Sequence, residues 1–455
     1  MAEPSLRKRI WGWYFFDWAS QPYHTVLLTF IFGPFFVSLA QDANLLAGQD
    51  SELAKANAQT MWSFCLTITG LLIGFGAPFL GSIADTAGRR MPWIVAFSLM
   101  YVVGAAGLWY TNPDGSNLVS MMTMFALGFI GAEFALIFIN SQLPALGNED
   151  EIGKLSGSGF AFGYAGGVMS LIVLLLLFVE QGNGKTLLGF DPLFGALDAD
   201  QREGTRITGP VVALWYAVFM IPYFLWVREV RNPNPGANIS TALRNLWQSI
   251  RDLRLRKSLA VYLGSSMLYR DALNGLYSFG GTFAALVLDF SVVQVGVFGI
   301  IAATAAAIFS YIGGLADSRF GPKPVVIASI IVLMGVCLVL VNLSPNAVFG
   351  IAFDTTAASS ITFYICGCLI GGMGGILQSA SRSLMVRHCN PAAPTESFGL
   401  YGLCGRATAF IAPALITIAT AATGSAQLGV SPLIFLFLAG LIMLLWVNPK
   451  GERFA

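Results

Sequence analysis

The sequence predicts an all-α membrane protein with twelve transmembrane helices in two pseudo-symmetric six-helix bundles. Three observations lead to this prediction. Hydrophobic residues make up 56% of the 455 residues and charged residues only 11%, against about 25% in a soluble domain. The apolar residues gather in continuous runs long enough to cross a bilayer. A short polar motif recurs in both halves of the chain, as in transporters built from internal repeats.

The apolar runs are continuous, whereas the strands of a membrane barrel would show alternating segments of about 10 residues. Each helix needs about 20 apolar residues to cross the hydrocarbon core. The first run is too long for a signal-peptide core and Asp17 adjoins it, so we expect a retained helix. We predict spans over residues 18–40, 61–84, 92–110, 118–141, 159–179, 209–227, 259–288, 294–315, 324–342, 360–382, 397–421 and 430–447.

Lys and Arg residues are distributed unevenly between the two sets of connections. Nineteen of them, Arg382 included, lie in one set, and only Lys55, Lys185, Arg202 and Arg206 lie in the other. Cationic connections tend to stay in the cytoplasm. We therefore expect both termini to be cytoplasmic.

Composition also excludes several classes of function. The net charge of +1 provides no field for nucleic acid, and two histidines are too few for a His-rich metal site. The six cysteines lie in apolar runs or beside cationic loops, so we expect no disulfide framework. We expect no metal, no cofactor and no catalytic residues.

An internal repeat divides the predicted spans into two groups of six. The segments 81–92 and 313–324 align without gaps at an offset of 232, matching at a Gly, an Ala, an Asp and a Pro. We predict an N-terminal bundle over 1–227, a cytoplasmic linker over 228–258 and a C-terminal bundle over 259–455.

The first copy of this repeat, with Gly81, Asp85, Arg89 and Arg90, resembles the signature loop of the major facilitator superfamily. Five further stretches resemble its vacuole-effluxer-like branch, named for a fungal vacuolar amino-acid exporter: Phe16–Pro22, Asn140–Pro144, Gly159–Gly167, Leu268–Ala272 and Gln378–Ser383. The resemblance covers essentially the whole chain and implies a transporter in a bacterial inner membrane. It also implies that the loop gates the cytoplasmic side.

The second copy of the loop departs from this signature. Asp317 and Gly321 are one residue further apart, and Arg319 stands without a second arginine. We take as gate residues Gly81, Asp85, Arg89, Arg90, Asp317 and Arg319. We expect the first copy to contribute more to gating than the second. The alternative is that Arg89 and Arg90 only enforce topology.

Five ionisable residues lie in or next to the predicted spans. Each needs a partner, water or a function because a charge is costly in a bilayer. They are Asp17, Glu133 and Asp271, with Arg270 and Arg406. One carboxylate therefore lacks a fixed cationic partner. We expect it to couple proton movement to transport, with Glu133 as first candidate and Asp17 as second. The alternative is a Glu133 that is permanently neutralised by one of the two arginines.

Polar residues share a helix face in the first and seventh spans. Asp17, Gln21 and His24 recur at i, i+4 and i+7, and Asp271 is followed by Asn274 beside Arg270. We expect these residues, with Glu133 and Arg406, to line one central solute site. An arginine would bind a carboxylate and an aspartate an ammonium, which suits an amino acid. The alternatives are an Asp17 that reaches the membrane surface and a local Arg270–Asp271 ion pair.

We therefore expect a monomeric secondary active transporter that exports or exchanges an amino acid by alternating access, with proton coupling. Its partners would be a small-molecule solute and the lipid bilayer. Another small solute, such as a sugar or a metabolite, is the first alternative. A membrane-embedded enzyme or a channel is the second, although no motif orders a nucleophile and a base.

Overall fold

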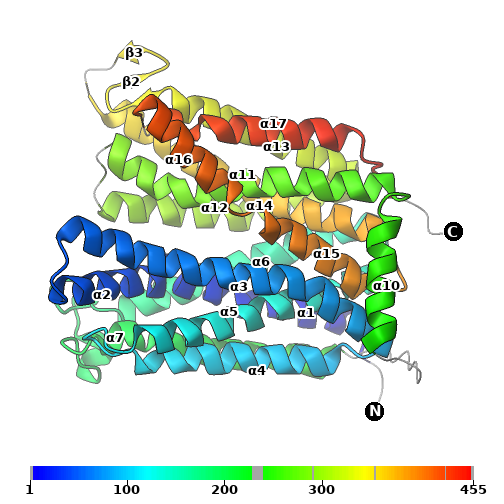
Figure 1. Ribbon diagram of the computed structural model, residues 1–455, viewed down its shortest axis with the longest axis horizontal. Helices are drawn as coiled ribbons and strands as arrows, with labels where there is room; N and C mark the ends of the chain where they lie inside the picture. Colours follow the sequence, from blue (N-terminus) through cyan, green and yellow to red (C-terminus); the bar gives the residue numbers. More distant parts are fainter. Residues whose placement is uncertain are drawn as a thin grey trace. The chain divides into compact units, whose positions relative to one another are not determined.

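The computed structural model describes residues 4–227, 239–288, 290, 292–352, 355–425 and 427–451. These residues form long helices and one small sheet (Figure 1). The chain forms two compact units. Unit 1 comprises Met1–Gly76, Ala87–Asn140 and Phe162–Pro235, and unit 2 comprises Ala77–Thr86, Ser141–Ala161 and Gly236–Ala455. The boundary at Pro235 lies inside the predicted linker, while two short segments of the predicted N-terminal bundle group with unit 2.

Unit 1 begins with an interrupted helix and continues with long apolar helices. Its elements are α1 (Leu6–Pro22), a π-helix η1 (Tyr23–Phe30), α2 (Phe32–Leu46), α3 (Ser51–Ala87), α4 (Met91–Gly107), α5 (Leu118–Asn140), α6 (Glu149–Leu177), α7 (Glu203–Arg206), α8 (Thr208–Phe219), α9 (Ile221–Trp226) and the 3-10 turns Leu108–Tyr110 and Pro192–Gly195. The last turns of α3 and the first turns of α6 belong to unit 2.

Unit 2 contains the remaining helices and a sheet. They are α10 (Ile239–Asp252), α11 (Lys257–Val287), α12 (Val292–Phe320), α13 (Pro322–Val341), α14 (Ala357–His388), α15 (Pro394–Ala407), α16 (Ile411–Thr423), α17 (Ser431–Leu445) and the 3-10 turns Leu143–Ala145 and Leu428–Val430. The strands β1 (Leu343–Ser344), β2 (Ala347–Val348) and β3 (Ile351–Ala352) pair antiparallel, with Leu343 opposite Val348 and Ala347 opposite Ala352. They join α13 to α14.

Each predicted span lies on a helical segment, and ten helices in the described part are long and apolar enough to cross a membrane. The predicted spans 259–288 and 397–421 are not among these ten. The first corresponds to α11, which contains Arg270 and Asp271. The second was expected to be continuous, but it breaks into α15 and α16. Pro413 explains this difference, because a proline in a helix interior removes a backbone bond and disfavours the turn before it.

The two repeat loops use the same local chemistry despite their different lengths. α3 is followed by Gly88 at φ +63° and α12 by Gly321 at φ +82°, a region that suits glycine after a helix end. A proline then lies in the first turn of the next helix, Pro92 in α4 and Pro322 in α13. The extra residue before Gly321 therefore lengthens a helix without changing how it ends.

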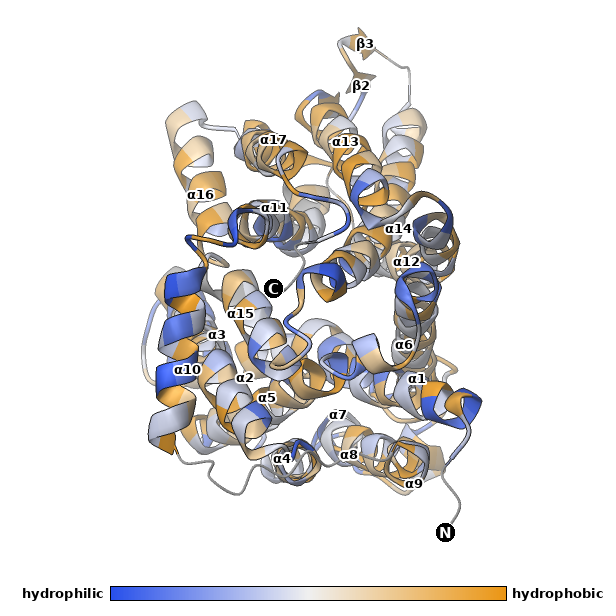
Figure 2. Cartoon of the chain, turned by 90° about the vertical axis from the view of Figure 1, so that its right-hand side faces the viewer, coloured by the Kyte–Doolittle hydropathy of each residue, from blue (hydrophilic) through white to orange (hydrophobic). Residues whose placement is uncertain are grey.

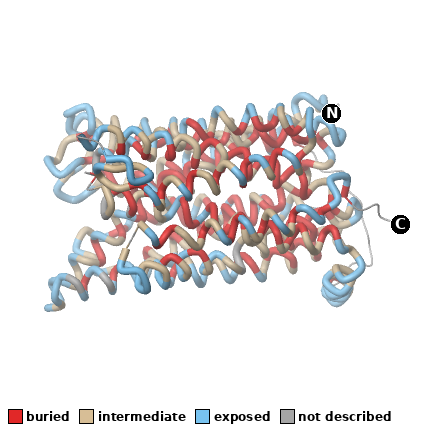
Figure 3. Tube along the Cα trace, turned by 90° about the horizontal axis from the view of Figure 1, so that it is seen from above, coloured by how far each residue is buried: buried red, intermediate tan, exposed pale blue. Residues whose placement is uncertain are grey.

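Hydropathy and burial follow the helix faces. Hydrophobic residues run along the helices, and hydrophilic ones are most evident on α10 and near helix ends such as the start of α1 (Figure 2). Buried residues concentrate along the middle of the helices, with exposed residues at the ends and loops (Figure 3). Polar groups buried along these middles need partners inside the protein.

Candidate functional site

The first helix is interrupted beside its polar residues. Pro22 has no backbone N–H, so it cannot donate the helical bond to the carbonyl of Trp18. The indole Nε1 of Trp215, in α8, donates to that carbonyl at 3.2 Å. The π-helix η1 starts directly after Pro22 and contains His24. Single π-helical turns inside helices are frequent at functional sites.

Three of the predicted residues in unit 1 lie on this helix and one on α5. Asp17 and Glu133 are each only 7% exposed, and His24 is partly exposed. His24 Nε2 lies 3.9 Å from Glu133 Oε1, and the His24 ring packs edge-on against Phe129. Glu133 therefore has a histidine beside it, a pairing that sequence analysis did not foresee. Gln21 is half-buried on the same helix.

Glycines of α6 allow this polar face to pack tightly within unit 1. A Cβ added at Gly163 would lie 3.1 Å from the carbonyl oxygen of Asp17, and one at Gly167 would lie 2.8 Å from the Gln21 side chain. Small residues at such positions let two helix backbones approach closely. A larger side chain on α6 would therefore displace the first helix.

In unit 2, Arg270 of α11 is held by α15. Its Nη1 donates to the carbonyl of Tyr401 at 3.1 Å, and its guanidinium lies 4.3 Å from the centre of the Tyr401 ring. A Cβ added at Gly405 would lie 2.5 Å from Nη2 of Arg270. Gly405 therefore makes room for the guanidinium. Arg406, predicted as a second solute-binding arginine, has a side chain outside the described residues.

Asp271 and its neighbour Arg270 have different partners, in contrast to the local ion pair that the sequence left open. Its Oδ2 accepts the backbone N–H of Ala412 at 2.9 Å, in the first turn of α16. A carboxylate at a helix N-terminus satisfies an orphan N–H and matches the helix dipole. Its buried Oδ1 has no hydrogen-bond partner among the described residues. Asn274, one turn further along α11, is exposed.

The first repeat loop lies against the start of α15. Oδ2 of Asp85 accepts the backbone N–H of Glu396 at 2.8 Å. A Cβ added at Gly81 would lie 2.7 Å from the carbonyl oxygen of Thr395, so only glycine fits there. Burial raises the pKa of Glu396, which precedes the predicted span, and the nearby charge of Asp85 adds to this effect. We call Gly81, Ser82, Asp85 and Glu396 the inner cluster.

The remaining predicted gate residues are placed differently. Arg89 and Arg90 belong to unit 1, where Arg89 is exposed. Asp317 is 1% exposed, and its side chain lies against Gly153 of α6, inside unit 2. Arg319 is exposed, with its guanidinium 5.4 Å from the centre of the Phe320 ring. The two copies of the repeat therefore have different surroundings.

Sequence analysis missed a buried arginine in unit 2. Arg382 was counted with the cationic loops, but it lies within α14 and is 2% exposed. Its Nε donates to Oγ of Ser156 at 2.9 Å, and its Nη2 donates to the Ser156 carbonyl at 2.7 Å. Its guanidinium also lies over the ring of Phe160. The sequence contained a signal for this contact, because Arg382 ends an apolar run and a charged residue there needs a partner.

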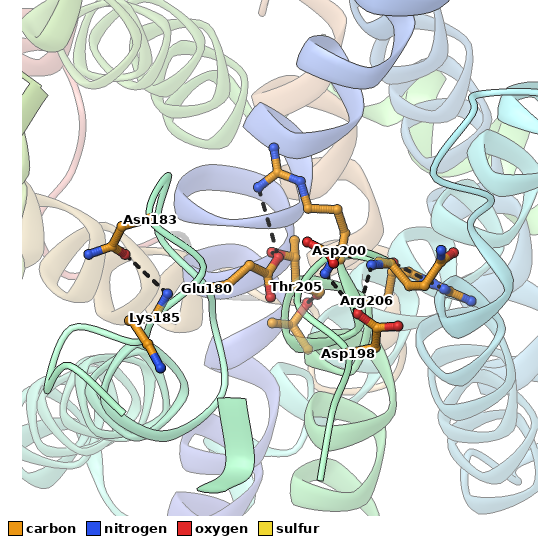
Figure 4. A network of polar contacts seen from close by, with 10 residues as sticks. Glu180, Asn183, Lys185, Asp198, Asp200, Thr205 and Arg206 are labelled. Carbon is orange, nitrogen blue, oxygen red and sulfur yellow. Dashed lines mark hydrogen bonds and ion pairs between the residues drawn. The ribbon is translucent and has the colours of Figure 1, made fainter. Parts of the chain in front are cut away.

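A second missed cluster orders the connection between α6 and α8 (Figure 4). Glu180 is 5% exposed, and its Oε1 accepts the hydroxyl of Thr205 at 2.5 Å. Nη1 of Arg202 lies 4.0 Å from the same oxygen. Arg206 Nε donates to the carbonyl of Trp109 at 3.0 Å. The first two contacts lie within the connection, and the third ties it to the 3-10 turn that follows α4.

Comparisons with known proteins all find similarity to one class of membrane protein. The family described as "Vacuole effluxer Atg22 like" matches residues 5–453. The "Uncharacterized MFS-type transporter YxiO" of Bacillus subtilis (strain 168) is 24% identical over 96% of this chain and 94% of its own. Autophagy-related protein 22 of Kluyveromyces lactis is 22% identical over 95% of this chain and 91% of its own.

Solved structures of the major facilitator superfamily share the fold. FucP, in the outward conformation, matches with a TM-score of 0.68 at 13% identity, over 97% of this chain and 98% of its own. The proton:xylose symporter XylE, bound to 6-bromo-6-deoxy-D-glucose, matches with a TM-score of 0.71 at 13% identity, over 97% and 96%. The predicted all-helical fold is thereby confirmed.

Proposed function

Because the chain belongs to the vacuole effluxer Atg22-like family of major facilitator superfamily transporters, we propose that it exports or exchanges a small polar solute, namely an amino acid. The protein is a multi-pass integral membrane transporter, and transporters of this superfamily are not enzymes. The proposal adds the solute class, alternating access and proton coupling. It also takes the protein to act as a monomer in a bacterial inner membrane, with both termini in the cytoplasm.

One observation carries the choice of solute: a cation and a carboxylate lie next to each other at a break in the predicted span 397–421. Arg270 keeps donors beyond the one given to Tyr401, because a guanidinium has five N–H groups. These donors suit a carboxylate. The Oδ1 of Asp271, or the carboxylate of Asp17, would accept an ammonium group. Asn274 adds an amide on the same helix.

Proton coupling is assigned to Glu133 and His24. A carboxylate enclosed by apolar side chains is costly when charged, so it favours a proton unless a cation is near. His24 provides such a cation only when it is itself protonated. Uptake of one proton by these two groups would raise the charge of unit 1 by one during transport, and its release would lower the charge again. Asp17 is the second candidate, about two helical turns before His24 on the first helix.

The inner cluster is assigned as the cytoplasmic gate. Asp85 holds the start of α15 through one charge-assisted hydrogen bond, and Gly81 allows the close approach. Both contacts must break for α15 to separate from the end of α3. We extend the gate to Arg89, Arg90, Asp317 and Arg319, as the repeat predicts.

The test is a counterflow assay with purified protein in liposomes. Liposomes filled with an unlabelled amino acid should accumulate the labelled one saturably, for at least one member of a panel of amino acids. Arg270→Ala should abolish this accumulation, and Arg270→Lys should weaken it because a lysine offers no fork of donors. Lys185→Ala, in the exposed connection between α6 and α8, is the matched control and should transport normally.

Two outcomes would contradict parts of the proposal. Counterflow of sugars, with none of any amino acid, would remove the solute class and favour the first alternative. Glu133→Gln should abolish accumulation driven by a pH gradient while exchange continues. If pH-driven accumulation survives this change, coupling lies elsewhere.

A further inference from the structure

The helix α10, inside the predicted linker, differs in direction from the long helix that follows it. It spans Ile239–Asp252 and runs across the end of α11 rather than along it (Figure 1). The following helix, α11, starts at Lys257, only five residues after α10 ends. α10 therefore stays close to the start of the predicted span 259–288. Residues 228–238, which precede it, lie outside the described residues.

One face of α10 is docked on unit 2. Ala242 is buried, and its carbonyl accepts the hydroxyl of Ser82 at 2.9 Å. The hydroxyl of Ser249 hydrogen-bonds the Glu396 carboxylate. Leu253, which follows the helix, lines a small pocket together with Glu396. Residues 242, 249 and 253 recur at i, i+7 and i+11, so they share a face. This face contacts the inner cluster.

A second face of α10 is apolar and uncovered. It consists of Ile239, Leu243, Trp247 and Ile250, which are all exposed, Trp247 to 70%. Their spacing of four, four and three residues places them on one side of the helix, roughly a quarter turn from the docked face at about 100° per residue. Large apolar side chains gathered on one exposed helix face indicate a binding surface.

Basic residues border this apolar face. Arg244 and Arg251 lie on its far side from the docked face, and both are exposed. Between residues 239 and 257 the chain has five cationic residues and a single acidic one, Asp252. An apolar strip with arginines along its edge matches a membrane surface, where side chains enter the acyl boundary and cations meet phosphates.

We propose that α10 binds the surface of the cytoplasmic leaflet and takes acidic phospholipid headgroups. Ile239, Leu243, Trp247 and Ile250 enter the boundary between headgroups and acyl chains, and Arg244 and Arg251 contact the lipid phosphates. The membrane is the occupant because α10 ends five residues before α11, which carries the predicted span 259–288, and because α10 carries the complementary charge. The proposal rests on the cytoplasmic orientation assigned above.

The docked face gives this binding a consequence for transport. One face of α10 contacts Ser82 and Glu396. The face about a quarter turn away would bind the lipid surface. Lipid binding would thus hold α10 on the inner cluster, and acidic lipid would stabilise the closed gate. This consequence depends on the proposed function, whereas the lipid contact does not.

The test is hydrogen–deuterium exchange with mass spectrometry on the full chain in lipid nanodiscs. Peptides covering 239–252 should exchange more slowly with acidic phosphatidylglycerol than with phosphatidylcholine alone. We expect a difference of at least about fivefold, which corresponds to the roughly 1 kcal/mol that one basic residue gains at an anionic surface. Peptides of α14 serve as the reference for correct folding.

Variants separate charge from apolar contact. Arg244→Gln with Arg251→Gln should remove the dependence on acidic lipid. Leu243→Asn with Trp247→Asn should speed exchange in both lipids. Asn245→Ala with Gln248→Ala, both exposed and off the apolar face, is the matched control and should behave as the native chain.

Two results would overturn the proposal. Equal exchange of α10 in both lipids would exclude recognition of acidic headgroups. The slower exchange of α10 could instead increase with protein concentration, with dimers that disappear in the Trp247 variant. This result would assign the apolar face to a second copy of the chain. Neither readout involves a transported solute, so a failed counterflow assay leaves this test intact.

Discussion

The interruption of the first helix leads to a quantitative prediction about three residues. Pro22 leaves the carbonyl of Trp18 without its helical partner, and Trp215 Nε1 donates to it at 3.2 Å. Trp215→Phe removes the donor and leaves the carbonyl without a partner. Hydrogen bonds inside membrane proteins contribute about 0.6 kcal/mol on average and up to about 1.7. We expect a loss of about 1 kcal/mol, a factor of about five in the unfolding equilibrium.

The decisive measurement is a double-mutant cycle with Pro22→Ala. An alanine at this position restores a backbone N–H four residues after Trp18, so the carbonyl regains a helical donor. In that background Trp215→Phe should cost about 1 kcal/mol less, because only ring packing is lost. Trp11→Phe changes a 42% exposed indole on the same helix and is the control.

The assay is reversible unfolding by sodium dodecyl sulfate in mixed micelles. An equal cost of Trp215→Phe in both backgrounds would refute the reasoning, since the indole would then contribute only its ring. The π-helix supplies a second readout. If Pro22→Ala restores regular helix, the residues after it rotate, and His24 moves away from Glu133. Transport driven by a pH gradient should then fall even where stability rises.

Three further predictions concern unit 2. Gly405→Ala should displace the Arg270 guanidinium, destabilise the fold by about 1–3 kcal/mol and raise the counterflow KM, because the new Cβ meets Nη2 at 2.5 Å. Ser156→Ala should cost about 1–3 kcal/mol in detergent unfolding, because the buried Nε of Arg382 loses its acceptor. Lowering the pH should slow hydrogen exchange of residues 394–407, because the raised pKa of Glu396 means that a proton is taken up as the inner cluster forms.

Each of these has its own control. Gly335→Ala adds a Cβ that meets nothing within 4 Å and should leave stability and KM unchanged. Ser170→Ala removes a buried hydroxyl that donates only to a carbonyl of its own helix, so it should cost less than Ser156→Ala. For Glu396, exchange rates are corrected for the intrinsic effect of pH, and Glu396→Gln should abolish the pH dependence. Slower exchange at higher pH would contradict the assigned sign.

Glycine and proline determine the backbone locally at several helix ends. Gly88 and Gly321 follow the ends of their helices, and Pro92 and Pro322 lie in the first turn of the next ones, so each residue type acts on the backbone where it stands. Pro413 carried an equally clear signal for the break between α15 and α16, but the apolar run around it concealed the break. Hydropathy measures which residues enter the membrane and is insensitive to an interruption inside it.

Partners of buried polar groups were harder to foresee. Glu133 was expected to couple protons or to be neutralised by an arginine, and His24 was expected only to share its site, yet His24 lies directly beside it. Arg382 was assigned to a loop, yet it binds Ser156, more than two hundred residues away in the sequence. A charged side chain in an apolar run indicates that a partner exists. It does not indicate which helix provides that partner.

The amino-acid sequence by itself determined that this chain enters a membrane, where its helices lie and how its two halves repeat. These properties follow from composition, from the length of apolar runs and from glycine and proline, which act within a few residues. Only the tertiary structure decided that Asp271 caps α16, that Asp85 holds the start of α15 and that α10 docks by one face and exposes another. Such contacts join residues far apart in the chain, and their geometry depends on how whole helices pack.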